Sequence, residues 1–179
     1  MKKTTKSGVF ITFIIIFLVA NRVFAWEIIT HNDVDNNSQL EVAYTKNNDG
    51  YSLEIYKDAS NAIRSRFSMN NSLLRLANKH CPTFQVDQRE IANRSTNDAR
   101  CISSPKWAEF ILGYIVDNEI KSSHLHNMMN GNKITFRYQL ENEGYEEVNF
   151  SLNGSKRVLL SVIGNNVTVR TDSGFSVDE

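Results

Sequence analysis

Short runs in which apolar and polar residues alternate recur along this chain, and turn-forming sequences follow them. In KITFRYQL, residues 133–140, every second residue is apolar; ENEG follows, and VNFSL at 148–152 alternates again. The same arrangement occurs earlier, where LEVAY at 40–44 and YSLEIY at 51–56 flank NNDG. Because successive side chains of a strand point to opposite faces, both segments predict antiparallel hairpins.

Other stretches predict further strands. IRSRFSM places Ile63, Phe67 and Met69 on one face and Arg64 and Arg66 on the other. Such alternation is typical of a strand with one buried face.

The remaining strand predictions are shorter. A strand is expected to begin just after Pro82, with Phe84 and Val86 as core positions. Another is expected at 167–170, VTVR, and LLRLA at 73–77 fits either a strand or a helical turn.

Three helices are also considered. Ser104 at a cap and Pro105 at the first helical position predict a helix after Cys101, although FILGYIV fits a buried strand as well. A second helix is expected from Ser122 or Ser123 to Gly131, and a third in SKRVLLSVIG. The apolar face of the first helix would consist of Trp107, Phe110, Ile111, Tyr114 and Ile115. The expected fold is therefore α+β: an antiparallel β-rich single domain with two or three short helices and one disulfide.

The N-terminus predicts export. Three lysines lie within residues 2–6, the apolar run 9–20 is too short to span a membrane, and Val23 and Ala25 suit a cleavage site. Residues 1–25 are therefore expected to be a signal peptide cleaved after Ala25, leaving no integral membrane segment in a periplasmic or secreted protein.

Cleavage changes the charge. It removes four of the 20 basic residues and none of the 20 acidic ones, so the remainder carries a net charge of −4. This balance gives no support to nucleic-acid binding, which depends on a basic surface. The expected organisation is a polar N-terminal arm at 26–39, one globular α+β domain at 40–171 and a flexible tail at 172–179.

The cysteines are Cys81 and Cys101. In an oxidising compartment such a pair favours one disulfide over a nucleophile or a metal ligand. It would close the base of the polar segment 88–100, which is expected to be a long surface loop. The candidate interaction residues on this loop are Gln88, Arg89, Glu90, Asn93, Arg94, Asn97 and Arg100.

Catalytic, metal and cofactor sites are not expected. His124 and His126 lie about 200° apart on a helix and cannot chelate one ion together. The acidic residues near the last hairpin turn are most simply interpreted as solvated surface charges. They are Glu141, Glu143, Glu146 and Glu147. The usual catalytic motifs do not occur.

A set of small patterns resembles the invasion-associated locus B family of exported bacterial proteins. The patterns are FQVD at 84–87, Cys101, a helix ending in MMNG, the hairpin after it, and FSLNGSKRVLL at 150–160. The resemblance covers about 80–164 and implies a mostly β, periplasmic or surface-associated protein with a role in host interaction, and hence virulence, or in the envelope. It supplies no catalytic residues.

Export, one expected core, acidic charge and the missing catalytic motifs favour a binding protein over an enzyme. We expect an exported accessory protein that contacts an unknown protein or envelope partner. The alternative is an inhibitor or immunity protein of a periplasmic hydrolase, with the loop 88–100 as its inserted element.

Overall fold

The computed structural model describes residues 25–33, 38–70, 73–77, 80–92, 101–141 and 144–172. The helices are α1 (Ser123–Asn130) and α2 (Ser155–Ile163). The strands are β1 (Glu27–Asp33), β2 (Ser38–Lys46), β3 (Ser52–Lys57), β4 (Ala62–Ser68), β5 (Thr83–Val86), β6 (Cys101–Ser103), β7 (Trp107–Tyr114), β8 (Glu119–Lys121), β9 (Lys133–Gln139), β10 (Tyr145–Ser151) and β11 (Thr168–Arg170).

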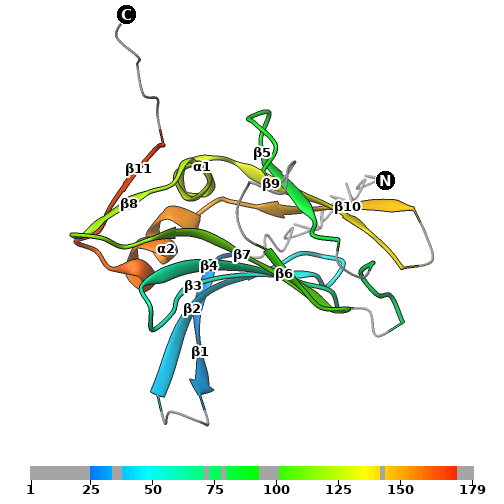
Figure 1. Ribbon diagram of the computed structural model, residues 1–179, viewed down its shortest axis with the longest axis horizontal. Coiled ribbons are helices and arrows are strands. Elements are labelled where there is room, and N and C mark those ends of the chain that lie inside the picture. Colours follow the sequence, from blue (N-terminus) through cyan, green and yellow to red (C-terminus); the bar gives the residue numbers. More distant parts are fainter. Residues whose placement is uncertain are drawn as a thin grey trace, which may run out of the picture.

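Two antiparallel sheets face each other. The larger has the order β1-β2-β3-β4-β7-β6, and the smaller has the order β10-β9-β5. In Figure 1 the smaller sheet and both helices lie on the same side of the six-stranded sheet. The six-stranded sheet therefore has an inner face toward these elements and an outer face turned away from them.

The core lies between the sheets and is rich in aromatic rings. Phe67 of β4 stacks on Phe136 of β9 with ring centroids 4.9 Å apart, and Phe84 of β5 meets Phe110 of β7 edge to face at 5.3 Å. All four side chains are essentially inaccessible to solvent. Burial of this kind is the main favourable contribution to folding, so these contacts hold the two sheets together.

The predicted hairpins, the strand after Pro82 and two of the helices are confirmed. β2 pairs with β3, and β9 pairs with β10. Helix α1 begins after Ser122, whose side chain accepts a hydrogen bond from the Leu125 N–H, and it ends before Gly131. Met128 and Met129 on its buried face belong to the core. At 73–77, where strand and helical turn were both open, Leu76 forms an isolated bridge with Leu140.

The helix predicted after Ser104 and Pro105 is wrong, and the alternative of a buried strand is correct. The segment forms β7, in which Ala108, Phe110 and Leu112 point into the core. Ser104 N–H donates to the Trp107 carbonyl, so these residues make the turn between β6 and β7. Serine followed by proline is common both at helix starts and in turns, and here pairing with β4 decided between them.

The prediction of a polar arm at 26–39 is also wrong for the central part of that range. Residues Glu27–Asp33 form β1, which pairs antiparallel with β2 over seven residue pairs. Trp26 is only 4% exposed, and its indole N–H donates to the Ser151 carbonyl of β10. A polar sequence can form an edge strand because such a strand hydrogen-bonds to only one neighbouring strand and buries only part of one face.

The α+β class is confirmed in its coarse form: a β-rich, largely antiparallel fold with one disulfide. β11 departs from the antiparallel rule because it pairs with β8 in parallel. In the part of the chain described, neither helix has the length and apolar character needed to cross a membrane.

Candidate functional site

The outer face of the six-stranded sheet carries an unusual group of side chains. Strand register places Glu54 opposite Arg66, and Arg66 opposite Glu109 on the next strand. Ile102 of β6 is in turn opposite Glu109. Directly opposed residues share a face, so side chains from four strands meet there. They are Glu54, Tyr56, Arg64, Arg66, Ile102, Trp107, Glu109 and Ile111.

Glu109 is the centre of this group. Its Oε2 accepts hydrogen bonds from Tyr56 Oη at 2.5 Å and from Arg66 Nη2 at 2.7 Å and Nε at 3.0 Å. Its Oε1 accepts one from Arg64 Nη1 at 3.0 Å. The Glu109 side chain is 7% exposed, so a charge removed from water is compensated by four hydrogen bonds.

Arg64 is shared between Glu109 and the turn that joins β3 to β4. Its Nε donates to Asp58 Oδ2 at 2.5 Å. Asp58 Oδ1 accepts from the backbone N–H groups of Ser60 and Ala62, as in an Asx turn. This network, which we call the ion-pair cluster, comprises Tyr56, Asp58, Arg64, Arg66 and Glu109.

Arg66 is held between two aromatic rings. Its Cζ lies 5.7 Å from the centroid of the Tyr56 ring and 5.0 Å from that of Trp107. Its side chain is still 36% exposed. Cation–π contacts and the two hydrogen bonds to Glu109 Oε2 fix the guanidinium in one position at the surface.

The electrostatics keep both acids ionised. Burial alone would raise the pKa of Glu109, but hydrogen bonds from Tyr56 and Arg66 and the nearby positive charge outweigh it, so that pKa lies below its ordinary value. Burial opposes ionisation of Asp58 too, yet hydrogen bonds from Ser60, Arg64 and Ala62 lower its pKa to about 2. Two arginines and two carboxylates balance, and neither acid is poised to exchange a proton near neutral pH.

Acid should therefore weaken the fold through these two groups. Their folded pKa values lie below the ordinary 3.8 and 4.5, so their contribution to stability is complete above those values and is lost as pH falls toward about 2. Urea unfolding measured at pH values from about 5 to about 2 should show a shallower loss of stability for Asp58→Asn than for the wild type. Identical pH dependence in the two proteins would contradict this.

Two tyrosines should resist alkaline titration. Burial and the adjacent Glu109 carboxylate raise the pKa of Tyr56 above its ordinary value. Burial and the 2.9 Å hydrogen bond from Tyr138 to Tyr51 raise the pKa of Tyr138. Because the raised pKa values favour the neutral forms, stability from these groups is lost as pH rises above the ordinary 10. We expect Tyr56 and Tyr138 to gain phenolate absorbance only when the protein unfolds; reversible formation of phenolate by all six tyrosines before unfolding would be inconsistent with this.

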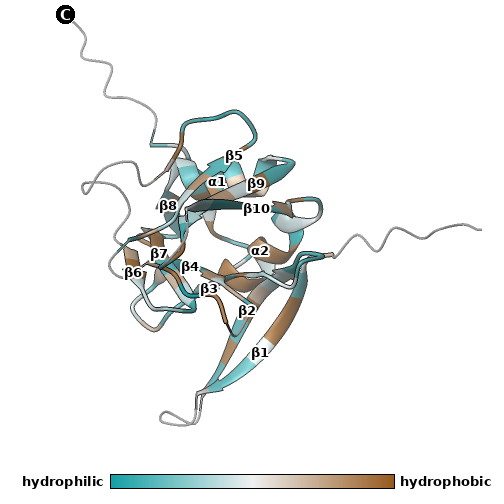
Figure 2. Cartoon of the chain, turned by 90° about the vertical axis from the view of Figure 1, so that its right-hand side faces the viewer, coloured by the Kyte–Doolittle hydropathy of each residue, from teal (hydrophilic) through white to brown (hydrophobic). Residues whose placement is uncertain are grey.

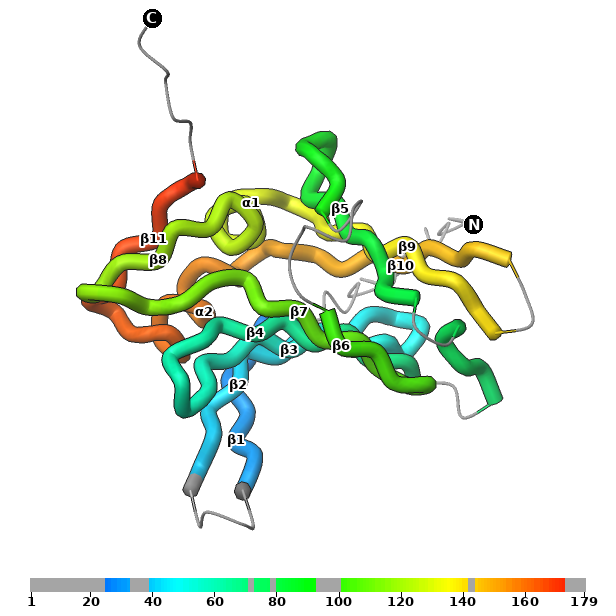
Figure 3. The backbone as a smooth tube through the Cα atoms, viewed as in Figure 1, coloured from blue at the N-terminus to red at the C-terminus, as the bar shows by residue number. Residues whose placement is uncertain are grey.

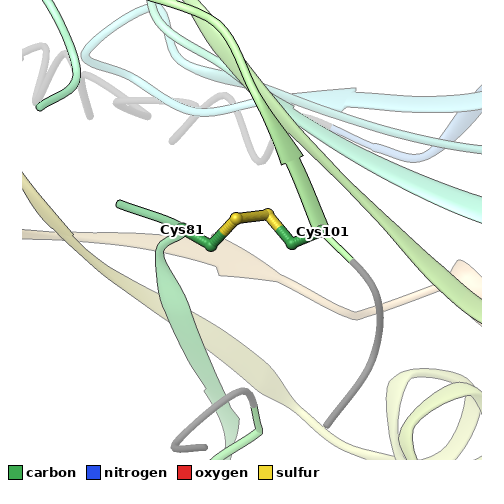
Figure 4. Close-up of a disulfide and its surroundings, with 2 residues drawn as sticks. All are labelled: Cys81 and Cys101. Atoms are coloured by element: carbon green, nitrogen blue, oxygen red, sulfur yellow. A yellow bond between two sulfur atoms is a disulfide. The ribbon is translucent and has the colours of Figure 1, made fainter. Parts of the chain in front are cut away.

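The predicted disulfide is present, and it does more than close a loop. Cys81 and Cys101 are bonded, with Cα atoms 6.2 Å apart. Cys81 lies just before β5 of the smaller sheet, and Cys101 is the first residue of β6 in the larger one (Figure 4). The bond therefore links the edges of the two sheets, whereas the Trp26 to Ser151 hydrogen bond links their opposite edges.

The start of the predicted interaction loop is held against the domain. Arg89 Nη1 donates to Asn127 of α1, and the Ala92 N–H donates to the Phe84 carbonyl at 2.8 Å. Gln88, Arg89 and Glu90 are exposed, and Ala92 is buried. Asn93, Arg94, Asn97 and Arg100 lie outside the described residues.

The histidines and acidic residues considered from sequence do not meet. The His124 ring packs edge to face on Phe84 at 5.3 Å, and His126 Nδ1 is buried without a hydrogen-bond partner. Glu141, Glu146 and Glu147 are exposed, and Glu143 lies outside the described residues. Among the residues that are described, no three His, Cys, Asp or Glu side chains are grouped to hold a metal ion.

Hollows of about 370–460 Å³ lie near the turn between β7 and β8, and the described residues that line them do not belong to the ion-pair cluster. One of about 460 Å³ is lined by Tyr114, Val116, Asp117, Glu119 and Lys121. The cluster is thus part of an open sheet face, a geometry that suits contact with a large partner better than enclosure of a small substrate.

Sequence reasoning missed Glu109 because it was placed on a predicted helix. The signal available was indirect: Arg64 and Arg66 alternate on one strand face, and Trp107, Glu109 and Ile111 alternate in the same way if 107–114 is taken as a strand. Comparison with protein-family models, with curated proteins and with solved structures found no match.

Proposed function

We propose that this chain is an exported binding protein that acts through protein–protein contact in the cell envelope or with a host, and that the outer sheet face makes the contact. The observation that carries the proposal is the fixed Arg66 between Tyr56 and Trp107, next to the exposed Ile102. Tyrosine, tryptophan and arginine are the residues most enriched at binding hot spots.

The rigidity of the group supports this use. A side chain that is already fixed loses little conformational entropy when a partner binds. Arg66 is partly exposed, whereas Glu109 balances its charge from below. A fitting partner surface offers acceptor oxygens for the exposed guanidinium edge and an apolar side chain for Ile102, which is 56% exposed.

Export is supported by the N-terminal sequence, with its lysines, its short apolar run and the Val23 to Ala25 cleavage pattern. The disulfide between Cys81 and Cys101 is compatible with an oxidising compartment. The resemblance to exported proteins of the invasion-associated locus B family leads to the same proposal of a role in the envelope or at the host surface.

The alternative is an inhibitor or immunity protein of a periplasmic hydrolase. It is favoured by the anchoring of the loop 88–100 at both ends, through Ala92 and Arg89 at its start and Cys101 just after it.

Site-specific photo-crosslinking in intact cells tests both proposals. A photoreactive amino acid is placed at Ile102 on the outer face, at Glu90 on the loop, or at Tyr145 as a control. Tyr145 is 61% exposed on β10 of the smaller sheet. We expect a specific protein adduct from position 102 and none from 145. Adducts from position 90 alone would mean that the loop, and not the outer face, makes the contact. Labelling at position 145 equal to that at the other two positions would contradict both proposals.

A matched pair of surface variants gives a second measure. Ile102→Ser should strongly weaken capture of the crosslinked partner, because it removes the apolar side chain from the contact without placing a carboxylate opposite Glu109. Its effect on stability should be at most about 1 kcal/mol. Val116→Ser, at a residue 64% exposed in the turn between β7 and β8, should leave capture unchanged. Equal capture by both variants would show that Ile102 is not in the interface.

A further inference from the structure

The hairpin formed by β1 and β2 extends beyond the two-sheet body of the molecule (Figures 1 and 3). Its strands pair from Glu27↔Tyr44 to Asp33↔Ser38. β1 is an edge of the six-stranded sheet, and no strand in the described ranges pairs with its other side. Alternate backbone N–H and C=O groups of β1 therefore point away from β2 and form a template for another strand.

β1 carries the charged residue Glu27 but lacks several other features that usually protect an edge. It contains no proline, no lysine and no glycine, and its register with β2 runs without a bulge. Proteins normally block such edges because they pair readily with other strands. The missing protection suggests that this edge is used.

The end of β1 that lies away from the body has little packing. Thr30, His31 and Asn32 are exposed, and Ile28 is 44% exposed. In Figure 2 the apolar part of β1 lies toward the body and the hydrophilic part toward the end of the hairpin. A two-stranded ribbon is marginally stable alone, so an added strand would stabilise it.

We infer that β1 pairs antiparallel with β1 of a second copy of this chain, about a two-fold axis at Ile29. In this register Ile29 is opposite Ile29 of the second copy, and Glu27 is opposite His31. The contact is isologous, so the Glu27 to His31 pair occurs twice. Within its own chain His31 Nε2 lies 3.7 Å from Glu54 Oε1, so Glu27 of the second copy would be met by the other ring nitrogen, Nδ1. An Nδ1–H can donate to that carboxylate, and the two isoleucines form an apolar pair.

Neighbouring registers that keep the faces aligned are less favourable. Centring the axis on Thr30 would pair two acidic residues, Glu27 and Asp33, twice. Centring it on Ile28 would place Glu27 opposite Ile29, and His31 would lie opposite Ala25, which precedes β1. Like charges directly opposite are destabilising, and an apolar side chain cannot satisfy a carboxylate. Charge complementarity therefore selects the axis at Ile29.

Cysteine crosslinking tests the register in the mature protein. Opposed residues have Cβ atoms about 4.5–5.5 Å apart, so Ile29→Cys should form an intermolecular disulfide under mild oxidation. Glu41→Cys, on the same hairpin but on β2, should not. Ile28→Cys mixed with Thr30→Cys should crosslink, whereas Thr30→Cys alone should not. Crosslinking of Thr30→Cys alone, or none from Ile29→Cys, would overturn the proposed pairing.

Sedimentation equilibrium tests whether the dimer exists without a crosslink. The interface is small, so the dimer should be weak and is sought at millimolar as well as micromolar concentrations. Ile29→Lys brings two ammonium groups together and should weaken the dimer at least about tenfold. Gln39→Lys adds the same charge at an exposed residue of β2, opposite Asn32 and on the other face of the hairpin from Ile29, and should leave dimerisation within about threefold of the wild type. A wild-type monomer at all concentrations, or equal effects of the two variants, would refute the inference.

Discussion

Replacing Glu109 by alanine is expected to lower the free energy of unfolding by about 3–5 kcal/mol. The substitution removes the acceptor of four hydrogen bonds and leaves Arg64 and Arg66 side by side on β4 without their shared carboxylate. Arg64 keeps Asp58 as a partner, whereas Arg66 loses both of its bonds to Glu109. Urea unfolding followed by tryptophan fluorescence and by circular dichroism measures the loss.

Glu54→Ala is the matched control, because Glu54 lies opposite Arg66 on its other side. Its side chain is 13% exposed, and its Oε1 lies 3.7 Å from Nε2 of His31. An ion pair of that kind contributes at most about 1 kcal/mol, so this variant should lose far less stability. Equal losses in the two variants would mean that the position on the sheet matters and the ion-pair cluster does not.

Removing the disulfide is expected to cost about 3 kcal/mol. The bond spans a sequence separation of 20 residues and joins the edges of the two sheets. Its loss therefore raises the conformational entropy of the unfolded chain and removes the covalent link between the β5 and β6 edges of the folded protein. The double variant Cys81→Ala/Cys101→Ala and the reduced wild type should unfold at the same, lower denaturant concentration.

The double variant also serves as the control for the reductant. Its unfolding midpoint should not change when reductant is added, whereas that of the oxidised wild type should fall. A midpoint for the double variant within error of the oxidised wild type would show that sheet packing alone holds this edge together.

Local patterns were sufficient for the hairpins and the two helices. In β9, and in β10 from Val148 onward, each second residue is buried, and a short turn brings the strands together, so pairing follows from neighbouring sequence. In α1 the Ser122 cap and Gly131 mark the ends, and in α2 Val158, Leu159, Val162 and Ile163 share the buried face. These elements depend on contacts between residues close in the chain.

Two elements needed the tertiary structure. Residues 107–114 have enough apolar positions to fit either a helical face or an alternating strand, and pairing with β4 more than 40 positions earlier decided for the strand. β1 is too polar to indicate a strand, and it is ordered by seven residue pairs with β2 and by the burial of Trp26. Tertiary contacts commonly override weak local preference.

The sequence by itself determined which side chains share a face, because alternation in a strand is fixed by backbone geometry. It therefore placed Arg64 and Arg66 together and opposite to Phe67, and it paired Cys81 with Cys101 because no other cysteine competes. Only the tertiary structure decided that Glu109 lies between the two arginines, that the disulfide joins two sheets, and that β1 is an open edge. Strand order and register between distant segments depend on the sum of many weak contacts across the sheet, and no single stretch of sequence contains that sum.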